Sequence, residues 1–116
     1  MENLSYTIKF NEEGLAQANI YSDELREVIL ELSANKNIEV EAEILRDSPT
    51  TMDFGGTLAI ILGTSAVVEI AKGIGNWLSK RNSASITIVA KNGKVVVENI
   101  SAKDASSLAD RWLQNL

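Results

Sequence analysis

The 116-residue chain contains no cysteine and no histidine, and it has a single proline. Without cysteine there is no disulfide framework and no thiolate nucleophile. Without histidine the chain lacks the side chain that most often carries protons near neutral pH and most often binds metals. These absences exclude thiol chemistry and histidine-based catalysis, and we predict no catalytic residue, no cofactor and no metal site.

Basic residues are also few, because 11 Lys and Arg stand against 16 Asp and Glu, giving a net charge of −5. Nucleic-acid-binding proteins normally present a basic face to phosphate, so we predict no nucleic-acid partner. The N-terminus lacks the basic and apolar regions of a signal peptide. The longest uncharged apolar run, residues 54–68, is shorter than the ~20 residues that a membrane span requires. We therefore expect a cytoplasmic protein without a membrane span.

The remaining composition is that of an ordinary globular protein, with 45% apolar and 23% charged residues. A chain of this length usually forms one domain with one core. We expect residues 1–116 to form a single α+β domain.

Alternating apolar residues predict strands over 4–10, 38–44 and 86–90, and a Val-rich run predicts another over 95–97. Ser22 is predicted to cap a helix that ends at 35–37, a second helix is predicted over 54–80, and a third from Ser101, with Asp104 completing a capping box. Asn92-Gly93 predicts a type I′ hairpin. The resulting order, β-α-β-α-β-β-α, predicts a two-layer, four-stranded mixed sheet with helices on one face and a parallel, right-handed first βαβ unit.

The predicted helix over 54–80 is apolar around roughly 260° of its circumference, whereas a helix that faces one core needs about 100°. A second apolar stripe lies beside the core-facing one. If the second stripe stayed exposed to water, the protein would lose the stabilisation of about 5–8 kcal/mol that burial of its three largest side chains provides. Two explanations of this second stripe are open: the chain's own helices cover it, or it is a protein-interaction surface. We predict the interaction surface, for a partner or for a homodimer. The stripe consists of Leu62, Ala66, Ile70 and Trp77.

Three glutamates, Glu39, Glu41 and Glu43, alternate with apolar residues along the second predicted strand. Side chains two apart on a strand stand ~7 Å apart, which is too far for them to chelate one cation. We interpret them as a solvated acidic ridge and as an alternative interaction face for a basic partner. Asp47, Ser48 and Asp53, in the loop that follows, are predicted to form turns and helix caps and not an anion site.

Motifs along most of the chain resemble the effector-associated constant component family of bacterial conflict and defence systems. Ser22-Asp23-Glu24-Leu25-Arg26 opens a helix, and a loop with Pro49 and Met52 leads into the Gly-rich segment Gly55 to Gly63. The next helix ends in Trp77-Leu78-Ser79-Lys80-Arg81, before an Ile/Val strand, Asn92-Gly93 and a Val-rich strand.

This resemblance implies a non-enzymatic adaptor that couples an effector encoded nearby, such as a peptidase or a TIR protein, to a sensing system. Two other functions remain open from the residues themselves. One is a small acidic inhibitor or immunity-type protein that binds a basic partner through the glutamate ridge. The other is a hydrolase with two carboxylates about 5–9 Å apart.

Overall fold

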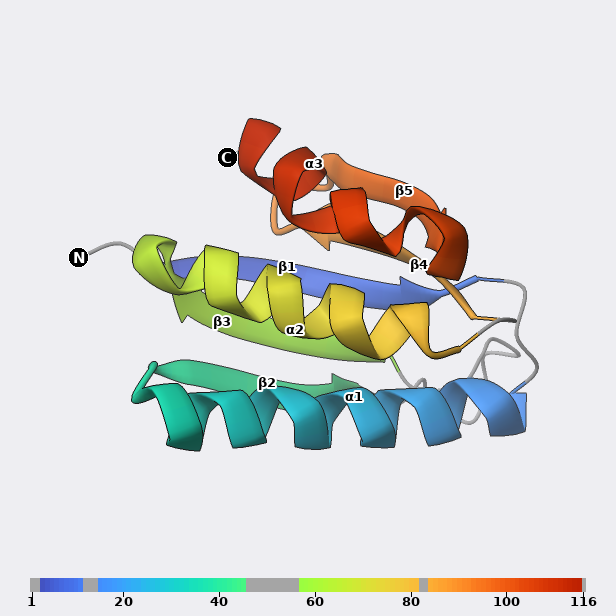
Figure 1. Cartoon of the computed structure of the whole chain (residues 1–116), viewed down its shortest axis with the longest axis horizontal. Helices are drawn as coiled ribbons and strands as arrows, with labels where there is room; N and C mark the ends of the chain where they lie inside the picture. Colours follow the sequence, from blue (N-terminus) through green and yellow to red (C-terminus); the bar gives the residue numbers. More distant parts are fainter. Residues whose placement is uncertain (1–2, 12–14, 46–56, 82–83, 116) are drawn as a thin grey trace.

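Three α-helices lie on one face of a five-stranded sheet in the described part of the chain (Figure 1). The computed structural model describes residues 3–11, 15–45, 57–81 and 84–115. The elements in chain order are β1 (Asn3–Phe10), α1 (Leu15–Lys36), β2 (Val40–Leu45), β3 (Thr57–Gly63), the 3-10 helix η1 (Thr64–Ala66), α2 (Val67–Ser79), β4 (Ser85–Ala90), β5 (Val95–Ser101), the 3-10 helix η2 (Ala102–Ser107) and α3 (Leu108–Gln114).

The sheet has the order β2-β3-β1-β4-β5, and every neighbouring pair is antiparallel. The predicted α+β class and the helices on one face are confirmed, whereas the predicted four-stranded mixed sheet is wrong. Since β3 is antiparallel to both β1 and β2, those two strands run in the same direction, as predicted. However, β3 lies between them, so they form no parallel pair.

The difference arises in the segment predicted as one long helix. Residues 57–63 form β3, and only residues 67–79 form an α-helix. Leu58, Ile60 and Leu62 point into the core, while Ile61 between them is 38% exposed. Part of the apolar surface that we assigned to two sides of one long helix therefore belongs to the two faces of a strand. Asp53, one of the residues that we expected to form a helix cap, lies outside the described residues. Ala66, the N-cap residue directly before α2, makes no side-chain cap bond.

Helix α1 begins at Leu15 and not at Ser22. Ser22 is buried within the helix, where its hydroxyl donates to the carbonyl oxygen of Asn19 over 3.2 Å. A serine hydroxyl can donate to a backbone carbonyl of the preceding helical turn, so a serine need not stand at the N-cap of a helix. The predicted end is confirmed, because Asn37 adopts the left-handed conformation (φ 54°) directly after the last helical residue.

The predicted hairpin of β4 and β5 is confirmed, but its turn differs. Of the two central residues only Gly93 has a positive φ (91°), so the turn is not type I′. The Gly93 amide donates to the Ala90 carbonyl and the Ala90 amide to the Lys94 carbonyl, which is the pattern of a three-residue loop with a bulge at glycine. The predicted capping box is also wrong, since Ser101 makes no side-chain cap bond to η2.

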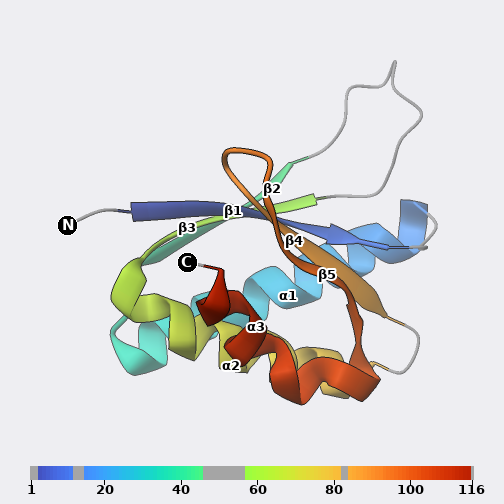
Figure 2. The same ribbon diagram turned by 90° about the horizontal axis from the view of Figure 1, so that it is seen from above.

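The core lies between the helices and the inner face of the sheet (Figure 2). Its strand residues include Tyr6, Ile8, Ile60 and Ile88, which are at most 5% exposed. The opposite face of the sheet, which we call the outer face, has no described helix over it. The two faces therefore offer different surfaces, one made of helices and one of strands.

Candidate functional site

The four residues predicted as a docking stripe belong to the core. Leu62 and Ile70 are at most 1% exposed, and Ala66 and Trp77 are 5% exposed. Leu62 lies on β3 while Ile70 and Trp77 lie on α2, so the residues do not form one helical stripe. The prediction that they form a contact face is corrected, because all four side chains are buried within the chain itself.

The three glutamates lie at an open edge of the sheet, since β2 is an edge strand. Glu41 and Glu43 are exposed on β2, and Glu39 is exposed just before it. The guanidinium of Arg26 on α1 donates to the carbonyl oxygen of Ala42 over 3.0 Å. This contact occupies part of the edge at which a further strand would otherwise pair.

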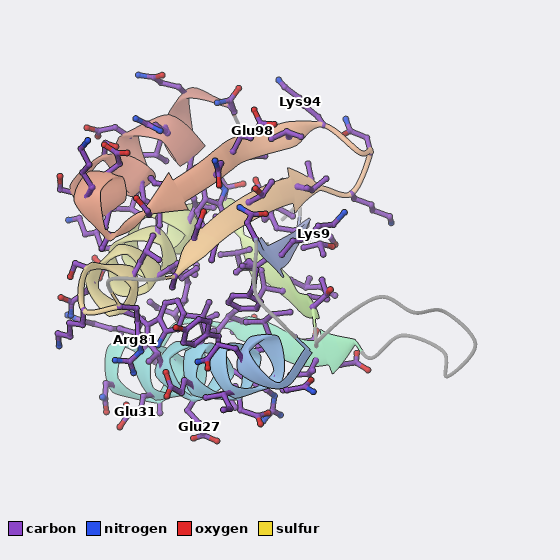
Figure 3. All side chains as sticks on the ribbon, turned by 90° about the vertical axis from the view of Figure 1, so that its right-hand side faces the viewer. Lys9, Glu27, Glu31, Arg81, Lys94 and Glu98 are labelled. Carbon is purple, nitrogen blue, oxygen red and sulfur yellow. The ribbon has the colours of Figure 1, made fainter. Side chains whose placement is uncertain are left out.

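Charge is distributed unevenly across the sheet. Between residues 15 and 45, which include α1 and β2, seven acidic residues stand against two basic ones. Between residues 57 and 115 seven basic residues stand against four acidic ones. Figure 3 shows Glu27 and Glu31 at one edge of the molecule and Lys94 at the other. The molecule is therefore acidic at its α1–β2 edge, and the excess of basic residues lies on the rest of the described chain, with three of the seven on α2 or just after it.

A groove of about 350 Å³ runs between α1 and α2 on the helix side of the molecule. Each helix contributes residues spaced by three, four and seven positions, so one face of each helix lines the groove. The floor is apolar and the rim is polar or charged. Its residues are Val28, Glu31, Leu32, Asn35, Gly73, Asn76, Trp77, Lys80 and Arg81.

One end of the groove is closed by a hydrogen-bonded ion pair. The guanidinium of Arg81 donates to Glu24 Oε1 from Nη2 over 2.7 Å and from Nε over 3.0 Å. The same carboxylate oxygen accepts a bond from Trp77 Nε1 over 3.3 Å. Arg81 also lies 5.7 Å from the centroid of the Trp77 ring. These contacts fix the position of Trp77 and join the end of α2 to α1.

We expect Glu24→Gln to lower the free energy of unfolding by only about 0.5–1 kcal/mol, because the paired side chains of Arg81 and Glu24 are 35% and 38% exposed and water screens their attraction. Equilibrium urea unfolding measures the change. Glu27→Gln, at an exposed position on the same helix, is the matched control and should be near neutral. A loss above about 2 kcal/mol for Glu24→Gln would contradict this account, since buried pairs and not exposed ones cost that much to break.

Sequence reasoning missed both this groove and a polar cluster on the outer face. In the cluster, Asn11 Nδ2 donates to Thr87 Oγ1 over 2.9 Å, and Ser85 Oγ donates to Asn99 Oδ1 over 2.7 Å. Asn99 is in the left-handed conformation (φ 51°) at a bulge of β5, and its backbone amide donates to Thr87 Oγ1 over 3.0 Å. These side chains bond mainly to one another, so the cluster explains how the bulge is held.

Asp47, Ser48 and Asp53 lie outside the described residues. Within the ranges that the structure covers, no three His, Cys, Asp or Glu side chains are grouped so that they could hold a metal ion. Among the described helices, none has the length and apolar character needed to cross a membrane.

The fold and the groove define a two-layer α+β protein with an antiparallel sheet covered by helices on one face. No family model matches the chain, and no curated protein matches it in sequence. Among solved structures, a phage SAM lyase in complex with S-methyl-5'-thioadenosine is similar with 18% sequence identity and a TM-score of 0.38. The similarity covers 87% of this chain and 91% of that one, and at this TM-score it carries no argument about function.

Proposed function

We propose that this protein is a non-enzymatic adaptor of a bacterial conflict system that acts in the cytoplasm and binds an effector, such as a peptidase or a TIR protein, in the α1–α2 groove. The proposal rests on the groove itself, which combines an apolar floor with charged rims of opposite sign. Glu31 stands on the α1 side, and Lys80 stands on the α2 side. An effector segment with an apolar anchor between a basic and an acidic residue is complementary to this surface.

The family resemblance supports the same location. The motif at the end of the second helix, Trp77 to Arg81, is one of the two most specific parts of the resemblance, the other being the loop with Pro49 and Met52. Trp77, Lys80 and Arg81 of that motif all line the groove. Trp77 is buried, whereas Lys80 is exposed and Arg81 is half-buried, so these two basic side chains can contact a partner. Arginine is among the residue types most enriched where binding energy is concentrated.

The test is direct binding between the purified chain and the purified product of each neighbouring gene that encodes a peptidase or a TIR protein. The double variant Glu31→Lys with Lys80→Glu exchanges the rim charges without changing the net charge. We expect it to weaken binding by tenfold or more, because each complementary pair becomes repulsive. Asp110→Lys with Lys103→Glu makes the same exchange at exposed positions near α3 and should leave the affinity unchanged. Equal affinity for the wild type and the groove variant would reject the groove as the effector site.

A second function, a small acidic inhibitor or immunity-type protein for a basic partner, is favoured by the exposed carboxylates at the α1–β2 edge. Reversing Glu39, Glu41 and Glu43 to lysine tests it in the same assay. Loss of binding in this variant, together with unchanged binding in the groove variant, would replace the adaptor proposal with the inhibitor function.

A further inference from the structure

The outer face of the sheet carries a band of small and apolar side chains without a described helix over it. Ile61 and Val95, both on this face, are 38% and 43% exposed. The strand register places one outer-face residue from each of the five strands in a single row across this face. In order from β2 to β5 the row is Glu43, Ala59, Thr7, Val89 and Val95.

Opposite charges stand at the two ends of this band. At the β2 end are Glu41 and Glu43, and Glu41 is paired with Ile61 in the register. At the other end are Lys91 and Lys94 in the β4–β5 turn, where the Lys91 amide donates to the Ser5 carbonyl. Figure 2 shows that this turn stands out from the sheet on the side away from the helices. All four charged residues are exposed.

We propose that the outer face binds a second copy of this chain, with the twofold axis parallel to the central strand β1. This rotation places the β2 edge of one copy over the β4–β5 turn of the other. Glu41 and Glu43 then face Lys91 and Lys94 of the second copy, and by symmetry the contact occurs twice. Within the band, Ala59 of one copy lies over Val89 of the other. Apolar contact and charge complementarity thus select the same arrangement.

The dimer has a moderate interface. Five strands spaced ~4.8 Å apart and ~20 Å long give a face of roughly 24 × 20 Å, below the ~800 Å² per partner of a standard stable interface. We expect a dissociation constant on the order of 10–100 µM, rising with salt. The helices of both copies remain on the outside, so the α1–α2 groove stays accessible, and the two proposals stand or fall separately.

The test exchanges charges between the two ends of the band. Glu41→Lys with Glu43→Lys is one variant, and Lys91→Glu with Lys94→Glu is the other. In either homodimer the facing charges repel, so sedimentation equilibrium from about 1 to 500 µM should show dissociation constants at least tenfold higher than wild type. An equimolar mixture restores opposite charges at both contacts. It should form a heterodimer with an affinity within about threefold of the wild type.

Two further variants separate this geometry from general charge effects. Asp23→Lys with Glu27→Lys makes the same change of net charge at exposed positions of α1, outside the groove, and should leave the affinity unchanged; Figure 3 shows Glu27 away from Lys94. Lys9 lies on β1, so a twofold axis along that strand sets the two Lys9 side chains facing each other. We therefore expect Lys9→Ser to tighten the dimer severalfold.

A wild-type chain that stays monomeric at 500 µM overturns the proposal. So does a mixture of the two variants that fails to restore the dimer while circular dichroism shows both variants folded. An α1 control that weakens the dimer as strongly as Glu41→Lys with Glu43→Lys would also overturn it. Binding of an effector in the groove is unaffected by any of these outcomes.

Discussion

Trp112→Ala is expected to lower the free energy of unfolding by about 3–5 kcal/mol, the usual cost of removing a fully buried large aromatic side chain. Trp112 lies on α3 and is 0% exposed. Its ring packs against Tyr6 of β1 in an edge-to-face arrangement, with 5.0 Å between the centroids and 80° between the planes. The substitution leaves a cavity between the last helix and the central strand, and equilibrium urea unfolding measures the loss.

A milder substitution at the same position tests the role of the indole nitrogen. Trp112 Nε1 is buried and has no hydrogen-bond partner among the described residues. A phenylalanine keeps much of the ring volume and removes this unsatisfied donor, whose burial is itself unfavourable. Trp112→Phe should therefore cost less than about 1.5 kcal/mol. If it costs as much as Trp112→Ala, the nitrogen makes a bond that stabilises the fold, and our description of the site is wrong.

The parts of the fold that sequence reasoning predicted are those with a clear contrast between apolar and polar positions. Leu4, Tyr6 and Ile8 alternate with polar residues, and β1 forms there. The same contrast between Val40, Glu41, Ala42 and Glu43 marked β2. Because apolar residues at every second position cover only one face of a strand, the placement of the helices on one side of the sheet also followed.

Strand β3 was missed because its alternation lacks that contrast. Leu58, Ile60 and Leu62 alternate with Ala59 and Ile61, so both faces are apolar in the sequence. A short, wholly apolar run fits a buried strand and a buried helix equally well. Its identity is settled by pairing, since β3 lies between β1 and β2 and satisfies the backbone of both. Pairing between segments that are distant in sequence cannot be read from local periodicity.

The candidate site depends on tertiary contacts in the same way. Val28 and Leu32 lie within the first predicted helix, but nothing in the sequence indicated that they would face Gly73 and Trp77 across a groove. Glu24 and Arg81 are 57 positions apart and become partners only when α1 and α2 pack together. The glutamates, by contrast, were predicted to be exposed from local alternation alone, and they are.

Two glycines of α2 provide the second large prediction, because each allows a close approach to a different kind of neighbour. A Cβ added at Gly75 would stand 2.8 Å from the backbone carbonyl oxygen of Ala105 in η2. Backbone cannot rotate aside as a side chain can, so α2 and η2 must separate. We expect Gly75→Ala to destabilise the protein by about 2–3 kcal/mol, despite the gain of up to about 1 kcal/mol in helix propensity.

Gly73→Ala is the matched control, since it adds the same methyl group two residues earlier in the same helix. The added Cβ would overlap Cδ1 of Leu32, the far end of a flexible side chain that is only half-buried at the groove. Leu32 can rotate, and the gain in helix propensity offsets much of the cost, so the change should stay within about 1 kcal/mol.

Thermal and urea unfolding of the two variants measure the difference. A Gly75→Ala protein as stable as Gly73→Ala would mean that η2 does not pack against α2 at this distance. A stable Gly73→Ala protein would also carry a narrower groove, and weaker effector binding in that variant alone would separate the groove from the stability of the fold.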